Sequence, residues 1–151
     1  MKKIEKISET QNYTAVNIGK LDELVDYIIP SSNGGPAFKG KVFVKDAIKS
    51  TGSEMSYSTI PPKKGSPYFH THNKNEELYI ILKGSGYFQV DNDYFPISEG
   101  SLIRVAPAGK RGMYNSSDEV MIYLCVQTKE NSLEEYGKAD GNLAENEAKW
   151  K

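Results

Sequence analysis

The sequence predicts an all-β protein that folds as one sandwich or barrel domain. Its 151 residues are the length of a single ordinary domain. Hydrophobic residues make up 38% of the chain and charged residues 26%, which is typical of a globular protein. From residue 41 onward, short apolar stretches alternate with turn-forming residues, and after the loop at 61–67 they leave no room for helices between them.

One short helix is predicted in the first third of the chain. Apolar residues at positions 21, 24, 25, 28 and 29 follow the spacing of a helix face, so a short helix is predicted over residues 21–29. Pro30 and the turn-forming cluster at 31–36 are expected to end it. We therefore expect residues 1–39 to form an N-terminal extension that contains this helix.

Short strands are predicted beyond this extension. Each is rich in β-branched or aromatic residues and is bounded by turn residues. They cover residues 41–45, 55–60, 68–72, 78–82, 86–90, 94–97, 102–105 and 120–127. The Asp-Asn-Asp segment at 91–93 is predicted to close a tight hairpin, because Asn and Asp tolerate left-handed backbone. The barrel is expected to span residues 40–128, followed at 129–151 by a polar tail that is partly ordered or holds a peripheral helix.

Charge and hydropathy indicate which partners to exclude. The formal net charge of −1 gives no broad attraction to nucleic acid or to anionic lipid. No apolar run approaches the roughly 20 residues that a membrane helix needs. The charged start of the chain is not followed by an apolar stretch, so no signal peptide is predicted. Cys125 is the one cysteine, which excludes an internal disulfide, and we expect it to lie in the core of a cytoplasmic protein.

Both histidines of the chain fall in one short motif, His70-Thr71-His72. Residues two apart on a strand point to the same face, so both imidazoles can converge on one ion. A polar turn follows, and a hairpin would bring Glu77 back beside them, with Tyr79 and Ile81 on the same inward face. Two imidazoles and a carboxylate suit a divalent transition metal such as zinc, iron, manganese or nickel.

The spacing around these residues resembles a known family motif. Gly65, His70-x-His72, Glu77 and Gly84 resemble the first motif of the cupin superfamily, including the six residues between the glutamate and the last glycine. The resemblance implies the double-stranded β-helix, or jelly-roll barrel, of a small single-domain cupin of the conserved-barrel type. It also implies a homodimer formed through the sheets. The alternate apolar residues 78, 80 and 82 would form a second hydrophobic face that needs cover.

The second cupin motif is similar from Gly100 to Asn115, with one departure. Counting the motif spacing forward from Gly100 or backward from Asn115 places Arg111 where the family has its last metal-binding histidine. Counting from Pro107-x-Gly109 instead places Gly112 there. Arginine is permanently cationic and cannot bind a metal ion. Three roles remain open for an inward Arg111: to pair with Glu77 and replace the ion, to pair with Glu76, or to bind an anionic ligand.

Electrostatics makes the metal prediction conditional. A guanidinium about 5 Å from a divalent ion would be repelled by several kcal/mol at an effective dielectric of 20. If a metal is bound, Arg111 is therefore expected to be paired with an acid or with an anionic ligand.

Two classes of function follow from this pattern. In the first, His70, His72 and Glu77 bind a divalent metal, and Arg111, Tyr79 and Glu76 contact a small, anionic ligand. As an enzyme, such a protein would be a metal-dependent oxygenase or isomerase acting on a small polar molecule. In the second, the barrel is a metal-free binding module for a small molecule, or a degenerate cupin in which the Glu77–Arg111 pair serves stability alone.

Overall fold

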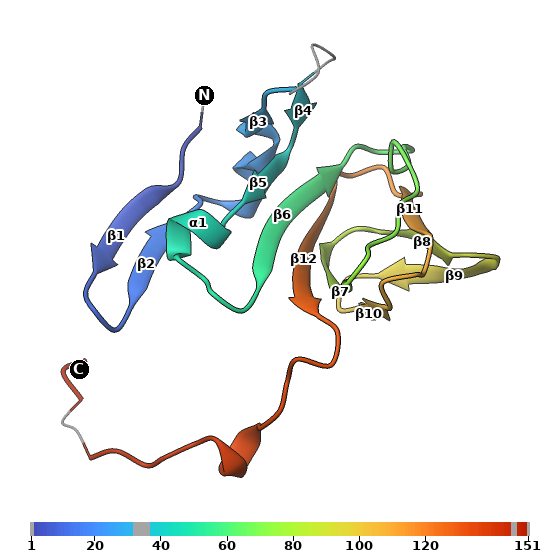
Figure 1. Cartoon of the computed structure of the whole chain (residues 1–151). Coiled ribbons are helices and arrows are strands. Elements are labelled where there is room, and N and C mark those ends of the chain that lie inside the picture. The colour runs from blue at the N-terminus through green and yellow to red at the C-terminus, as the bar shows by residue number, and fades with distance from the viewer. Residues whose placement is uncertain (1, 32–36, 146–147, 151) are drawn as a thin grey trace.

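The computed structural model describes residues 2–31, 37–145 and 148–150, and its centre is a pair of antiparallel β-sheets that face each other (Figure 1). The larger sheet has the strand order β10 (Leu102–Val105), β7 (Asn75–Lys83), β12 (Met121–Lys129), β6 (Glu54–Ile60) and β5 (Lys41–Phe43). The smaller sheet has the order β11 (Arg111–Asn115), β8 (Ser85–Val90) and β9 (Asp93–Ser98). The predicted all-β architecture is thus the one observed.

The core lies between the two sheets because each strand buries alternate side chains. In β7, Glu77, Tyr79 and Ile81 are at most 5% exposed, whereas Leu78 on the opposite face is 38% exposed. This alternation agrees with the predicted inward face of the strand. The buried apolar residues of the cluster come from strands of both sheets: Ile60, Tyr79, Ile81, Phe88, Ile97, Val105, Met113, Met121 and Cys125.

The N-terminal region covers the outer face of the larger sheet. It contains the hairpin of β1 (Glu5–Glu9) and β2 (Thr14–Asn17), the 3-10 helix η1 (Leu21–Asp26), the paired strands β3 (Ile28–Ile29) and β4 (Phe38–Lys39), and the helical turn α1 (Lys45–Ile48). A second apolar cluster joins this region to the sheet through Leu24, Tyr27, Val42, Val44 and Ile122, with Leu82 packed against it. The predicted second apolar face is therefore covered in part by the chain itself.

The predicted helix over residues 21–29 differs from the structure in type and length. The backbone N–H of Tyr27 donates to the carbonyl of Leu24, which is the tight bond of a 3-10 turn, and Tyr27 is already extended. Leu24 is buried, but Leu21 and Val25 are 39% and 44% exposed, so no continuous apolar face forms. Residues 28–29 pair with β4 instead. Positions 32–36 of the predicted turn cluster lie outside the described residues.

Within the barrel, the predicted strand over residues 68–72 is wrong and one strand was missed; strands β1 to β4 of the N-terminal region were not predicted either. Residues 68–72 form a loop whose backbone pairs with β11 through an isolated bridge between His70 and Arg111. Pro67 precedes this loop and cannot donate a ladder hydrogen bond. The missed strand is β11, whose Arg-Gly-Met-Tyr-Asn sequence lacks β-branched residues. Long-range pairing with β8 makes it a strand.

The C-terminal segment leaves the barrel at the end of β12 (Figure 1). From residue 131 to residue 145 its side chains are exposed, and its one helical element is the 3-10 turn η2 (Gly137–Ala139). Within the described parts of the chain, no helix is both long and apolar enough to cross a membrane.

Candidate functional site

A cavity of about 440 Å³ lies between the two sheets. This volume is in the range of pockets that bind small molecules. One end is polar and holds the predicted site residues, and much of the remaining wall is aromatic. The residues that line the cavity include Phe38, Lys39, Lys41, Phe43, Ser58, Tyr68, His70, His72, Glu77, Tyr79, Phe88, Arg111, Met113, Tyr123, Cys125 and Gln127.

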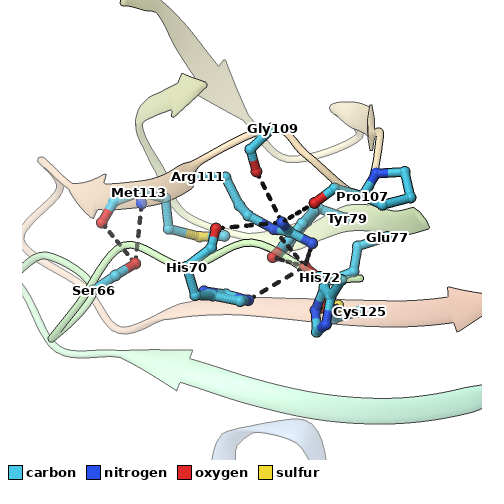
Figure 2. A network of polar contacts seen from close by, with 10 residues as sticks. All are labelled: Ser66, His70, His72, Glu77, Tyr79, Pro107, Gly109, Arg111, Met113 and Cys125. Atoms are coloured by element: carbon cyan, nitrogen blue, oxygen red, sulfur yellow. Dashed lines mark hydrogen bonds and ion pairs between the residues drawn. The ribbon is translucent and has the colours of Figure 1, made fainter. Parts of the chain in front are cut away.

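A buried ion pair closes the polar end of the cavity (Figure 2). Glu77 projects inward from β7, and Arg111 opens β11, 34 residues later in the chain. The Nε of Arg111 donates to Oε2 of Glu77 at 2.8 Å, and Nη2 lies 2.7 Å from the same oxygen as an ion-pair contact. Their side chains are only 1% and 3% exposed. Of the three predicted partners for Arg111, the structure thus has Glu77.

The Nη1 group of Arg111 serves the backbone around it. Nη1 donates to the carbonyl of Gly109 at 2.8 Å and lies within 3.4 Å of the carbonyls of His70 and Pro107 (Figure 2). These carbonyls belong to loops that end at the cavity. The guanidinium therefore joins β7, β11 and two loops, while its buried Nη2 has the ion-pair contact with Glu77 but no hydrogen-bond partner among the described residues.

The carboxylate of Glu77 is the centre of a wider polar network. The Tyr79 hydroxyl donates to its Oε2, and the Cys125 thiol donates to its Oε1 at 3.4 Å. Burial by itself would raise the pKa of Glu77, but the hydrogen bond from Tyr79 and the charge of Arg111 outweigh it and lower the pKa to about 2. Burial raises the pKa values of Tyr79 and Cys125 well above their usual range. Glu77 is therefore ionised, whereas Tyr79 and Cys125 keep their protons at neutral pH.

The two histidines approach Glu77 from the loop before β7. Nε2 of His72 lies 3.0 Å from Oε1, and Nε2 of His70 lies 3.5 Å from Oε2. The loop is held by the bridge between His70 and Arg111 and by the His72 N–H, which donates to the carbonyl of Pro107 at 2.8 Å. Burial lowers the pKa of His70 because it disfavours the charged imidazolium.

These residues fit a metal ion in donor type and spacing. One ligand atom from each of His70, His72 and Glu77 lies within 4.8 Å of the others, so this cluster could hold a metal ion. The charge fits less well. Two neutral imidazoles, the carboxylate and the Arg111 guanidinium already sum to zero, so a divalent ion would leave two uncompensated positive charges in a buried site.

The other predicted ligand-binding residues divide between the two faces of β7. Tyr79 lines the cavity, as predicted. Glu76 does not reach the cavity, because alternation turns it to the outer face, where it accepts a 2.6 Å hydrogen bond from Arg104. Lys39 and Lys41 line the cavity and were missed. The alternation of polar and apolar residues in Lys41-Val42-Phe43 could have indicated that Lys41 faces the cavity. Val42 packs in the N-terminal cluster, so its two neighbours face the other side of the strand.

Comparisons with known proteins agree with this architecture. Residues 56–127 match the model of the cupin domain family. A cupin protein of Bacteroides fragilis has a structure with 34% sequence identity and a TM-score of 0.66, over 77% of this chain and 94% of that one. The chain belongs to the cupin superfamily.

Two further similarities extend this result. A conserved Klebsiella pneumoniae protein with a double-stranded β-helix domain is 19% identical, with a TM-score of 0.55 over 76% of this chain and 90% of that one. This likeness supports the fold. An uncharacterized protein of Methanocaldococcus jannaschii is 30% identical over 66 residues, which are 44% of this chain and 53% of that one. The match thus spans about half the length of this relative.

Proposed function

We propose that this cupin binds a small organic molecule in its barrel cavity and does so without a bound metal ion. The observation that carries the proposal is the Arg111–Glu77 ion pair, buried at the end of a cavity of about 440 Å³. A largely apolar pocket with a few convergent polar groups is the usual form of a small-molecule site.

Arg111 supplies the positive charge that a metal ion would supply. Its guanidinium neutralises Glu77 from 2.7 Å and is itself bonded to three carbonyl groups. A metal ion at Glu77 would have to share the carboxylate with this cation, in surroundings that water screens poorly. Tyr79 and Cys125 are held protonated, so neither supplies an activated nucleophile here.

A second candidate function is metal-dependent chemistry, and the clustering of His70, His72 and Glu77 favours it. These three residues would hold the ion. A divalent ion with open positions would supply Lewis-acid or oxygen chemistry, as in an oxygenase or isomerase for a small polar molecule. The two candidates differ in the metal affinity that they expect.

Metal content separates the two candidates. Protein without a histidine tag, incubated with zinc or manganese and then desalted, is expected to retain far less than one ion per chain. The Arg111→His variant is expected to retain about one, because it removes the cation and completes a set of three imidazoles and a carboxylate. The measurement is elemental analysis by mass spectrometry, with a His70→Ala variant as the control. Stoichiometric metal in the wild type that is lost in His70→Ala would overturn the metal-free proposal.

Binding in the cavity is tested with an uncharged fluorescent probe, phenylnaphthylamine. Its fluorescence is expected to rise on binding to the wild type, equally with and without a metal chelator. Gln127→Trp should abolish the rise, because Gln127 lines the cavity and the larger side chain would fill it. Circular dichroism shows whether the variant is folded. No binding to the wild type, or binding that the chelator removes, contradicts the proposal.

A further inference from the structure

We infer that the ligand of this cavity is a small organic anion with an apolar, ring-bearing body, whose charged group binds Lys41 and Lys39. The inference rests on the proposed function and names the class of ligand. Three features support it: the direction of Lys41, the charge balance of the lining, and the aromatic side chains around the opening.

Lys41 is directed toward the cavity by the register of β5. It lies opposite Ser58 of β6 in the antiparallel ladder, and both residues line the cavity. Val42 is buried in the N-terminal cluster on the other face of the strand. Phe43 returns to the cavity side, and the Lys41 ammonium lies 4.7 Å from the centre of its ring. Lys41 is half-buried, so an ion held there is partly shielded from water.

The lining of the cavity has an excess of positive charge. Its formally charged residues, within the described part of the chain, are Lys39, Lys41, Arg111 and the single acid Glu77. Arg111 and Glu77 neutralise each other. The two lysines have no acidic partner among the described side chains, although the whole chain carries a net charge of −1. A cavity with two unpaired cations attracts an anion.

The aromatic residues at the opening select an anion that also has an apolar body. Phe38, Phe43 and Tyr68 line the cavity and remain 47%, 45% and 56% exposed. Phe88 and Tyr123 continue this surface inward. A wholly polar anion would leave these rings in water, and an uncharged apolar molecule would leave both lysines unpaired. An amphipathic anion satisfies both sets of groups.

The test compares two probes that share a ring skeleton and differ in charge. Anilinonaphthalene sulfonate carries a negative charge, whereas phenylnaphthylamine does not. We expect the wild type to bind the sulfonate more tightly. Lys41→Gln should weaken sulfonate binding about tenfold, as for one partly screened charge pair, and leave phenylnaphthylamine binding unchanged. Added salt should weaken the sulfonate alone.

Control variants make the result specific. Lys45→Gln removes a lysine from α1, outside the cavity, and is expected to change neither affinity. Lys41→Arg keeps the charge and should keep sulfonate affinity. An unchanged ratio of the two affinities in Lys41→Gln would overturn the inference while phenylnaphthylamine binding upholds the proposed function. Failure of both probes to bind the wild type would overturn both.

Discussion

Replacing Arg111 by methionine is expected to lower the free energy of unfolding by about 3–5 kcal/mol, the usual cost of breaking a buried ion pair from one side. The variant leaves the Glu77 carboxylate buried without its main cationic partner, and Glu77 is only 3% exposed. It also removes the donor that serves the carbonyls of His70, Pro107 and Gly109. Urea denaturation followed by circular dichroism measures the loss.

Two further variants separate the buried pair from a general effect of losing arginine. The double variant Arg111→Met with Glu77→Gln removes both charges and should recover part of the loss, because no unpaired charge stays buried. Arg104→Met breaks a pair with Glu76 on the outer face, where the arginine side chain is 49% exposed. It should cost at most about 1 kcal/mol. Equal losses in Arg111→Met and Arg104→Met would contradict the central role of the buried pair.

Replacing Phe88 by alanine is expected to cost about 3–5 kcal/mol of unfolding free energy, as for other large aromatic residues removed from a core. Phe88 is fully buried in β8 and contacts Tyr79 edge to face, with ring centres 5.0 Å apart. Its ring also stacks on Phe95 at 5.9 Å. The truncation removes these contacts and enlarges the ligand cavity, which Phe88 lines. Urea denaturation gives the cost.

The matched control for this variant is Phe43→Ala. Phe43 lines the same cavity but is 45% exposed at its opening, so its truncation leaves no closed void and should cost less than about 1 kcal/mol. Phe88→Leu should recover more than half of the loss, because it refills most of the volume. A Phe88→Ala variant as stable as Phe43→Ala would show that the space between the sheets is not packed around this ring.

The ion pair also explains why the site differs from a metal centre built on the same fold. A metal ion holds its ligands together, and here Arg111 makes five contacts with Glu77 and backbone carbonyls. In the proposed function the cavity keeps this polar end without an ion, and we propose that Lys39 and Lys41, which also line it, recognise the charge of the ligand.

Much of the barrel could be predicted from the sequence because local patterns determine it. The period of two in β7 placed Glu77, Tyr79 and Ile81 on one inward face, which their burial confirms. The residues at 91–93 were predicted to turn, and Asp91 has the left-handed backbone that this turn requires. The motif spacing was enough to single out Arg111, since each end of the motif leads to the same position.

The sequence by itself thus determined the all-β class, the inward face of β7 and the charges that meet at the site. Only the tertiary structure decided that Arg111 pairs with Glu77, that Glu76 turns outward to Arg104, and that the histidines lie on a loop. The physical reason is the separation along the chain over which each interaction acts. Strand periodicity acts between neighbours, whereas the partner of a buried charge is chosen by strand register between segments that are far apart in the chain.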